Sequence, residues 1–414
     1  MQGTSLTVFA WRNLWRNRRR TLLTLASISF GVFLAVLMTG ITDRHYSDMI
    51  DLAAKVGSGH VTIQHPEYLD TPTMSRSVNG MEALAATAAA NPQVVTSAPR
   101  ILGPAMIATA NDSFGGMLIA IDPEHESADT LSILDAVEGG EMFTSADDKG
   151  IILGAKLADN LGAQIGDRVV YTLTDRGGEM TSGVARLRAR VATGSPSIDG
   201  SLSMLAIGAL REALGYGPDE ATQLAIFIDD QRRSGEVARG LRSQLPEGAT
   251  ALAWHELQRE LSAFIAMDTG GATFMQVVLA ILISAGIFNT LFVSVMERLR
   301  EFGILLAIGF SPSRLFRLVI LESFWLGVAG LVMSVAVTAG PYLYLVTNGL
   351  DTSGLLGGEM DIAGVGMPTH LKVGLFPASA LLIATAAMAA TLLAGLYPAW
   401  RAGRVEPVES IRMV

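Results

Sequence analysis

The sequence predicts an α-helical membrane protein with four transmembrane helices and a mixed α/β extracytoplasmic domain inserted between the first and second. Half of the 414 residues are hydrophobic and only 17% are charged, and the mean hydropathy is +0.40. This combination is typical of a membrane protein with soluble parts. Charge-free windows of spanning length lie at 21–42, 269–296, 323–350 and 373–400. The third window extends backwards past a single Glu322, so we place that span at 315–346.

The first span, 21–42, follows a cluster of arginines and therefore has the outline of a secretory signal. Its apolar region is too long for a cleaved peptide, and no site of the A-x-A type follows before Asp43. We interpret it as an uncleaved anchor. Because the number of spans is even, both termini are expected on the same side of the membrane.

The distribution of charge predicts which side that is. Outside residues 43–270 nearly all Lys and Arg residues lie near the N-terminus, in the loop around 297–317 or in the C-terminal tail, and Lys372 is the exception. Residues 43–270 carry 31 Asp and Glu against 17 Lys and Arg. The positive-inside bias therefore predicts that both termini and the 297–317 loop are cytoplasmic and that residues 43–270 form a large acidic domain on the outer side.

Residues 1–20 are expected to form a cytoplasmic helix lying in the membrane interface, with apolar residues on one face and polar residues on the other. The alternative is an N-terminal extension of the first span. The residues predicted to meet the interface are Trp11, Arg12, Trp15, Arg16, Arg18, Arg19 and Arg20.

Residues 43–268 are predicted to form the outer domain and a stalk. Period-two alternation and turn residues indicate strands at 60–64, 100–109, 117–121, 150–153, 168–173, 184–191 and 223–228. Helices are expected at 81–90, 155–161, 205–214 and 235–244. Apolar residues at helical spacing over 251–267 predict a stalk continuous with the second span, 269–296, or else a separate helix packed on the domain.

The remaining connections are shorter. Gly340-Pro341 should kink or end the third helix, because proline removes a backbone hydrogen bond. A glycine-rich outer loop is expected at 347–372 and a cytoplasmic tail at 401–414, with a final short helix after Pro407.

The cytoplasmic segment 297–314 has the most informative pattern. A charged group is followed by nine almost wholly apolar residues, 302–310, and Ser311-Pro312 then predicts a helix start. Nine helical residues rise only about 14 Å, far less than the roughly 30 Å of a bilayer core. We therefore expect this segment to bury itself against another protein, an ATPase, or alternatively to pack within its own chain.

The residues that would carry catalysis or bind a cofactor are missing from the sequence. It has no cysteine and no Walker A motif, and its nearest string, GIILGAKL at 150–157, lacks the required Ser or Thr. His255-Glu256 opens like a zinc-protease helix, but Arg259 stands where the second ligand is needed. The six histidines show no ligand spacing. We expect no catalytic residue, no metal site and no cofactor on this chain. Glu322 is interpreted as a juxtamembrane acid beside basic neighbours rather than a proton relay.

Several stretches together resemble one family. ERLREFGILLAIGFSPSRLFRLVILESFWLGVAG (297–330) is similar to the V-x-E-R-x-R-E-I-G-I-L-R-A-I-G-A segment of permeases related to the macrolide exporter MacB, the lipoprotein-releasing LolC and LolE, and FtsX. LYPAWRAGRVEPVESIR (396–412), WRNLWRNRRRTLLT (11–24), GIILGAKLADNLGAQIGDRV (150–169) and GSGHVTIQ (57–64) resemble other parts of these proteins. The layout is nearest to LolC and LolE. Leu306 departs from the pattern, since a basic residue is common there.

The resemblance implies a type VII ABC transporter permease, a homodimer or heterodimer served by a separate cytoplasmic ATPase that holds ATP and Mg. It also implies a bacterial inner membrane location, with the outer domain 43–268 and the loop 347–372 in the periplasm. By position, Phe302, Ile304, Leu305, Ala307 and Ile308 would bury in the ATPase groove. Gly303 and Gly309 would permit close approach and a turn. Ion pairs would orient the loop through Glu297, Arg298, Arg300 and Glu301.

The implied function is transmission of ATP-driven motion to the periplasmic domain, which extracts or exports a lipoprotein, lipid or amphiphile. A periplasmic chaperone or adaptor would be a further partner. The alternative is an FtsX-like signalling scaffold that activates a cell-wall hydrolase, although such proteins have a much smaller outer domain. A membrane-anchored enzyme has no supporting motif, and no feature indicates nucleic acid.

Overall fold

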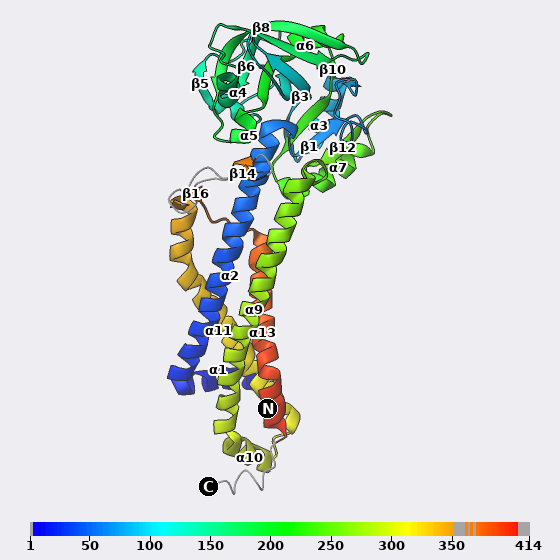
Figure 1. The fold of residues 1–414 in the computed structure, drawn as a ribbon. Coiled ribbons are helices and arrows are strands. Elements are labelled where there is room, and N and C mark those ends of the chain that lie inside the picture. The colour runs from blue at the N-terminus through cyan, green and yellow to red at the C-terminus, as the bar shows by residue number, and fades with distance from the viewer. Residues whose placement is uncertain (1–2, 352–360, 363–364, 367–369, 405–414) are drawn as a thin grey trace. The chain divides into compact units, whose positions relative to one another are not determined.

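The computed structural model describes residues 3–351, 361–362, 365–366 and 370–404. The chain forms two compact units (Figure 1). Unit 1 comprises Met1–His45, Ala266–Asp351 and His370–Val414, and unit 2 comprises Tyr46–Ile265 and Thr352–Thr369.

Unit 1 is built from helices. The helices that belong to it wholly or in part are α1 (Gly3–Leu14), η1 (Trp15–Asn17), α2 (Arg18–Ala53), α9 (Arg259–Glu297), α10 (Leu299–Ala307), α11 (Pro312–Thr347) and α13 (Pro377–Gly403). Two short strands, β13 (Leu350–Asp351) and β16 (His370–Leu371), pair with each other. Among the described residues, four helices are long and apolar enough to cross a membrane, namely the helix through α2 and the helices α9, α11 and α13.

The chain changes direction between α1 and α2. Figure 1 shows α1 running across the helices of unit 1 before the chain turns at η1 into α2. The Thr21 hydroxyl donates a hydrogen bond to the Leu14 carbonyl, seven residues earlier. In a straight α-helix seven residues rise about 10.5 Å, so this contact requires the bend. Residues 1–20 therefore do not continue the first span as one straight helix, which was the alternative interpretation of the sequence.

Small residues let the helices of unit 1 approach closely. A Cβ atom added at Gly330 of α11 would lie 2.6 Å from an Ile28 side-chain carbon of α2. A Cβ at Gly395 of α13 would lie 2.9 Å from the Ser323 Cβ of α11. Close backbone approach at small residues is the usual packing mode of apolar helices in lipid.

Helix α11 continues through Pro341 to Thr347. Of the two outcomes expected at Gly340-Pro341, a kink or an end, the end of the helix is therefore wrong. The missing amide costs one hydrogen bond, and the uninterrupted apolar sequence on both sides keeps the helix. The helix expected after Pro407 lies outside the described residues, as does most of the 347–372 loop.

Unit 2 is a mixed α/β domain. Its strands are β1 (Val61–Gln64), β2 (Val78–Asn79), β3 (Val94–Ala108), β4 (Ser113–Ile121), β5 (Val137–Gly140), β6 (Gly150–Gly154), β7 (Arg168–Thr174), β8 (Met180–Val191), β9 (Leu202–Ala206), β10 (Glu220–Ala221), β11 (Gln223–Ile228), β12 (Thr250–Ala253), β14 (Asp361–Ile362) and β15 (Val365–Gly366). Its helical segments are η2 (Ala54–Ser58), α3 (Met81–Ala89), η3 (Ser132–Asp135), α4 (Ala155–Asn160), α5 (Pro196–Asp199), α6 (Ile207–Leu214), η4 (Gln231–Arg233), α7 (Ser234–Arg242) and α8 (Trp254–Leu257).

Ten of these strands form one sheet in the order β12-β1-β11-β3-β4-β9-β6-β8-β5, with β7 joining β3 to β8. Strands β3, β4, β9, β6, β8 and β7 thus close into a ring. Most neighbours are antiparallel, but β9 runs parallel to β4 and β6 runs parallel to β8.

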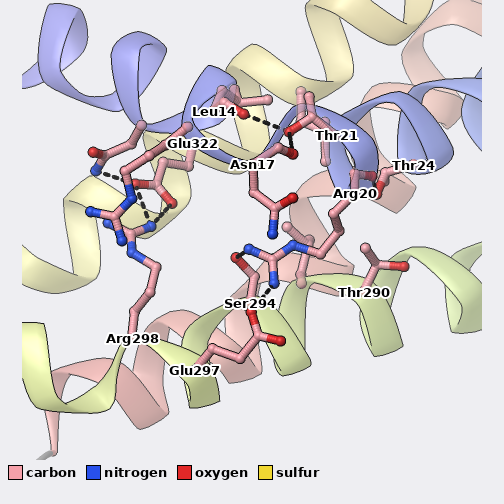
Figure 2. A pocket seen from close by; sticks show the side chains of 14 residues that line it. Leu14, Asn17, Arg20, Thr21, Thr24, Thr290, Ser294, Glu297, Arg298 and Glu322 are labelled. Atoms are coloured by element: carbon pink, nitrogen blue, oxygen red, sulfur yellow. Dashed lines mark hydrogen bonds and ion pairs between the residues drawn. The ribbon is translucent and has the colours of Figure 1, made fainter.

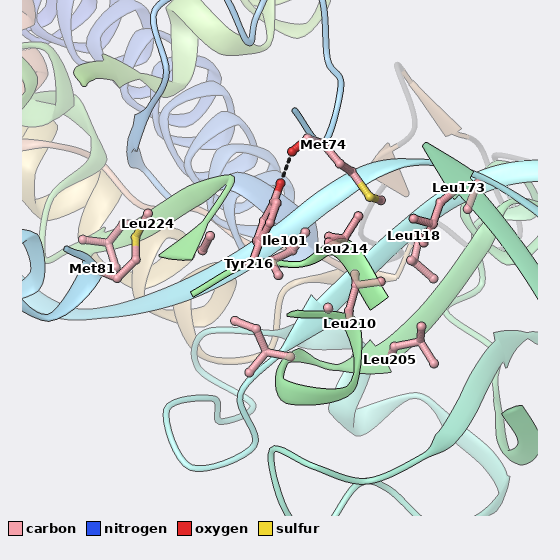
Figure 3. Close-up of a cluster of buried hydrophobic side chains, with 14 of the residues drawn as sticks. Met74, Met81, Ile101, Leu118, Leu173, Leu205, Leu210, Leu214, Tyr216 and Leu224 are labelled. Carbon is pink, nitrogen blue, oxygen red and sulfur yellow. Dashed lines mark hydrogen bonds between the residues drawn. The ribbon is translucent and has the colours of Figure 1, made fainter. Parts of the chain in front are cut away.

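Both faces of the central strands are buried. In β4, Leu118 and Ala120 belong to the larger hydrophobic cluster, whereas Ile119 and Ile121 belong to a second cluster on the opposite face. Alternate side chains of a strand point to opposite faces, so a continuous apolar run is what a strand covered on both sides requires. Figure 3 shows part of the larger cluster.

Most predicted strands and helices of unit 2 are present with small shifts at their ends. Leu205 was assigned to a helix but lies in β9, and α6 begins at Ile207. The stalk expected over 251–267 is continuous with the second span from Arg259 onward, since α9 runs to Glu297. Its first part was predicted wrongly, because β12 occupies the first residues and α8 ends at Leu257. The local apolar spacing of both segments suits a helix, but pairing with β4 and β1 overrides it.

Candidate partner-docking site

Helix α10 is a short helix with a defined start and end. Helix α9 stops at Glu297, and Arg298 has non-helical dihedral angles before α10 begins. At the other end Gly309 has a φ of +98°, and the amides of Gly309 and Phe310 donate to the carbonyls of Leu306 and Leu305. This pairing with a left-handed glycine is a Schellman motif. Helix α11 then begins with Ser311 as N-cap residue and Pro312 in the first turn.

One face of α10 packs inside unit 1. Phe302 is fully buried and belongs to a cluster with Leu315 and Leu318 of α11 and Ala399 of α13. Gly303 is also buried, and Leu305 is half-buried against the same cluster. The structure therefore places Phe302 and Gly303 in the core of this chain, away from any surface that a partner could reach.

The other face of α10 is exposed and largely apolar. Ile304 is 47% exposed and Ile308 is 72% exposed. Arg300, Ala307 and Gly309 are exposed as well. We call Arg300, Ile304, Ala307 and Ile308 the outer face of α10.

The charged residues at the start of α10 form ion pairs within the chain. Glu301 accepts a hydrogen bond from Arg16, and Glu297 accepts one from Arg20. Arg20 also donates to the Ser294 hydroxyl at 2.8 Å. Burial raises the pKa of Glu301, but the hydrogen bonds from Arg16 and Arg298 outweigh it and hold that pKa below its usual range. Two of the arginines predicted to meet the membrane interface thus bind acidic residues of α9 and α10.

The other predicted interface residues lie on the surface of α1, η1 and α2. Trp11 and Trp15 are each 39% exposed and pack edge to face, and Trp11 also packs edge to face on Trp325 of α11. Arg12, Arg18 and Arg19 are exposed. These positions keep amphipathic rings and cations at one end of the helices, the arrangement typical of an interfacial segment.

A polar cavity of about 370 Å³ lies between α1, α2, α9 and α11. Figure 2 shows Asn17, Arg20 and Thr24 on one side and Thr290, Ser294 and Glu297 on the other. At its far end Glu322 of α11 binds Arg298, whose Nη1 atom lies 3.2 Å from Oε1 and 3.1 Å from Oε2. The sequence singled out Glu322 as a juxtamembrane acid, and this contact with a basic neighbour agrees with that interpretation.

A second buried polar cluster lies in unit 2 and was missed from the sequence. The fully buried Arg100 guanidinium binds Glu126 through two hydrogen bonds of 2.6 and 2.9 Å. It also donates to the carbonyls of Gly57 and Thr130. Arg100 lies in β3 among apolar residues, but its hydrogen-bond partners come from other segments of the chain. No local sequence pattern therefore predicts that it is buried. The cluster is fully paired and holds the end of η2 to the sheet.

No group of three or more His, Cys, Asp or Glu side chains that could hold a metal ion occurs in the part of the chain that the structure describes. His60 contacts Asp51 at 3.0 Å, and His125 contacts Asp122 at 3.0 Å. His60 also accepts a hydrogen bond from the Ile228 amide at 3.2 Å.

Comparison with known families matches both parts of the chain. Residues 21–237 match the family described as MacB-like periplasmic core domain, and residues 273–407 match FtsX-like permease C-terminal. The first match covers more than half of the chain, and the two together leave out residues 1–20, 238–272 and 408–414.

Individual relatives agree with this assignment. The chain is 25% identical over 350 residues to the lipoprotein-releasing system transmembrane protein LolC of Xylella fastidiosa, covering 79% of this chain and 80% of the relative. It is 20% identical over 362 residues to LolE of Haemophilus influenzae, covering 84% of each chain. It is 27% identical over 184 residues to the macrolide export ATP-binding/permease protein MacB of Syntrophobacter fumaroxidans, covering 44% of this chain and 23% of the relative.

The exposed apolar face on a short helix, the four long apolar helices and the two family matches lead to one assignment. The chain belongs to the family of ABC transporter permeases that combine a MacB-like periplasmic core domain with an FtsX-like permease C-terminal region.

Proposed function

We propose that this chain is a non-catalytic permease subunit that receives ATP-driven movement from a separate ATPase and passes it to unit 2 across the membrane. The observation that carries the proposal is the division of α10 into a buried face and an exposed apolar face. Phe302 anchors the helix in its own chain, while Ile304, Ala307 and Ile308 remain available. An apolar helix face set into a groove is a common mode of protein recognition.

The distribution of charge supports the side of the membrane that we propose for each part of the chain. The basic residues beside α10 and at the N-terminus favour the cytoplasmic side for α10 and both termini, and the acidic unit 2 then lies in the periplasm. ATP and Mg belong to the partner, since this sequence has no phosphate-binding loop. Helices α2 and α9 each contribute residues to both units, so both are candidates for carrying movement between them.

The cargo that we propose is a lipoprotein, or another lipid-bearing or amphiphilic molecule. The relatives matched over about four fifths of their length are named lipoprotein-releasing proteins. A second permease subunit, identical or different, and a periplasmic chaperone would complete the assembly. Mass spectrometry of molecules that copurify from native membranes tests the cargo: a lipoprotein or amphiphile supports it, whereas a cell-wall hydrolase would support a signalling scaffold instead.

The docking face is tested by Ile304→Asp combined with Ala307→Asp. Burying carboxylates in an apolar groove is unfavourable by several kcal/mol, so the ATPase should no longer copurify while the permease stays in the membrane. Ile165→Asp is the matched control, because Ile165 is a similarly exposed isoleucine, 50% exposed, in unit 2. If the ATPase binds the double variant and turns over normally, α10 is not its docking site.

A further inference from the structure

Glu322 links three segments of unit 1. Its Oε1 atom accepts a hydrogen bond from the Asn13 side chain of α1 at 2.7 Å. Both of its oxygens accept from Arg298, which lies at the junction of α9 and α10. The Glu322 and Arg298 side chains are only 13% and 11% exposed. One shielded carboxylate therefore joins α1, α11 and the start of α10.

Arg298 contacts three side chains. Besides Glu322, its Nε atom donates to Glu301 at 3.3 Å, and its guanidinium lies 5.0 Å from the centre of the Phe302 ring. Phe302 is the residue that anchors α10 in the core. The buried Phe302 side chain thus fixes the orientation of α10. Arg298, which is bound by Glu322, packs on the Phe302 ring and helps to position it.

Stability alone does not explain this arrangement. A shielded ion pair gains little over well-packed apolar side chains of the same size, because removing two charges from water is costly. The ion pair instead defines a relative orientation, since a carboxylate bound by an amide and a guanidinium fixes both partners in one geometry.

The other ion pairs near α10 differ in exposure. The Arg16 side chain is 57% exposed and its partner Glu301 is 44% exposed, and Glu297 is 58% exposed. Pairs of this kind are screened by salt and contribute little. The Glu322 contact is shielded, so it is the one that persists when exposed pairs are weakened.

We propose that Glu322 is a positioning residue that makes α1 and α10 move as one body, so that a partner pushing on α10 also displaces α1 and, through η1, the start of α2. This inference rests on the proposed function for the source of the movement. The contact itself belongs to the permease and exists without a partner.

The first test uses the permease alone. The chain has no cysteine, so Arg12→Cys and Ala307→Cys introduce one spin label on α1 and one on α10. In otherwise native protein at high salt the distance distribution between the labels should be narrow. Glu322→Gln keeps the shape but loses the charge, and should broaden the distribution. Ser334→Ala is the control, because Ser334 is a buried polar residue of the same helix that bonds only within α11 among the contacts described.

The second test uses the complex with its ATPase and chains without labels. Glu322→Gln should leave the ATPase bound but reduce the stimulation of ATP hydrolysis about fivefold to tenfold, a range typical of coupling between sites. Ser334→Ala should not. A merely structural role would lower thermal stability without broadening the distance distribution.

The outcomes separate the two proposals. If Glu322→Gln leaves both the label distribution and the stimulation unchanged, Glu322 does not position α10, whatever binds there. If the native chain fails to bind an ATPase, the proposed function is wrong, and the label distribution still decides whether Glu322 joins α1 to α10.

Discussion

The Tyr68 hydroxyl lies in the interior of unit 2, where burial controls its ionisation. It donates to the Leu102 carbonyl at 2.6 Å. Burial raises the pKa of Tyr68 to about 12, against a hydrogen bond with Thr222 that lowers it. The neutral phenol is therefore strongly favoured in the folded protein.

This shift predicts a loss of stability in alkali. The unfolded tyrosine ionises near pH 10, whereas the folded one does so only near 12, so its contribution is complete below about pH 10 and disappears as the pH rises towards 12. The loss amounts to roughly 2 to 3 kcal/mol. Thermal unfolding of the native chain between pH 9 and about 12 measures it. Tyr68→Phe should make the pH dependence shallower, while burial, which also raises the pKa values of Tyr216 and Tyr171, keeps part of it. An equally steep dependence in that variant would contradict the assignment.

For single residues, the sequence predicted which charged side chains form ion pairs better than it predicted their partners. The acidic and basic residues at 297–301 were expected to form ion pairs, and three of them do so within the chain. Arg16 and Arg20, the partners of Glu301 and Glu297, were predicted to meet the membrane interface instead. The pairs join residues more than 270 positions apart, and no local period encodes such a contact.

Helix α10 shows the same limit at the level of an element. A short apolar helix between two charged groups was predictable from composition and from Ser311-Pro312. The sequence did not predict which face of α10 packs within its own chain, because Phe302, Ile304 and Ile308 are all apolar. Periodicity locates a buried face only when polar residues mark the opposite one. Packing against α11 and α13 decides that Phe302 is inside and Ile308 outside.

Packing between α2 and α11 gives a prediction at this scale. Gly330→Leu should destabilise unit 1 by about 1 to 3 kcal/mol, because the new side chain would collide with Ile28. Gly340→Leu, on the same helix with nothing within 4 Å of the added Cβ, is the matched control. Survival of a monodisperse elution peak after heating in detergent measures the difference. Equal losses for the two variants would mean that the Gly330 contact is unimportant.

At the scale of the whole molecule, the four long helices and the α/β character of unit 2 followed from the sequence, but the order of strands did not. Strand β9 pairs in parallel with β4 although some eighty residues separate them, and its apolar run continues into α6. A run of that length suits a strand or a helix equally. The sheet order is fixed by pairings of this long-range kind.

The charge asymmetry predicts sidedness that labelling can measure. Because the chain lacks cysteine, single cysteines at Glu179 in unit 2 and at Ser313, beside α10, report on each side without background. A membrane-impermeant maleimide should label Glu179→Cys in cells whose inner membrane is intact, and Ser313→Cys only after that membrane is opened. Labelling of Ser313→Cys in intact cells would reverse the proposed topology.

The closed ring of strands in unit 2 has a consequence for solubility. Closure removes strand edges, and among the described strands the ten-stranded sheet ends only at β12 and β5, each four residues long. Edges so short offer little template for pairing with another chain. A domain rich in β-structure can thus remain dispersed at high local concentration, and the acidic charge of unit 2 adds to the repulsion between copies.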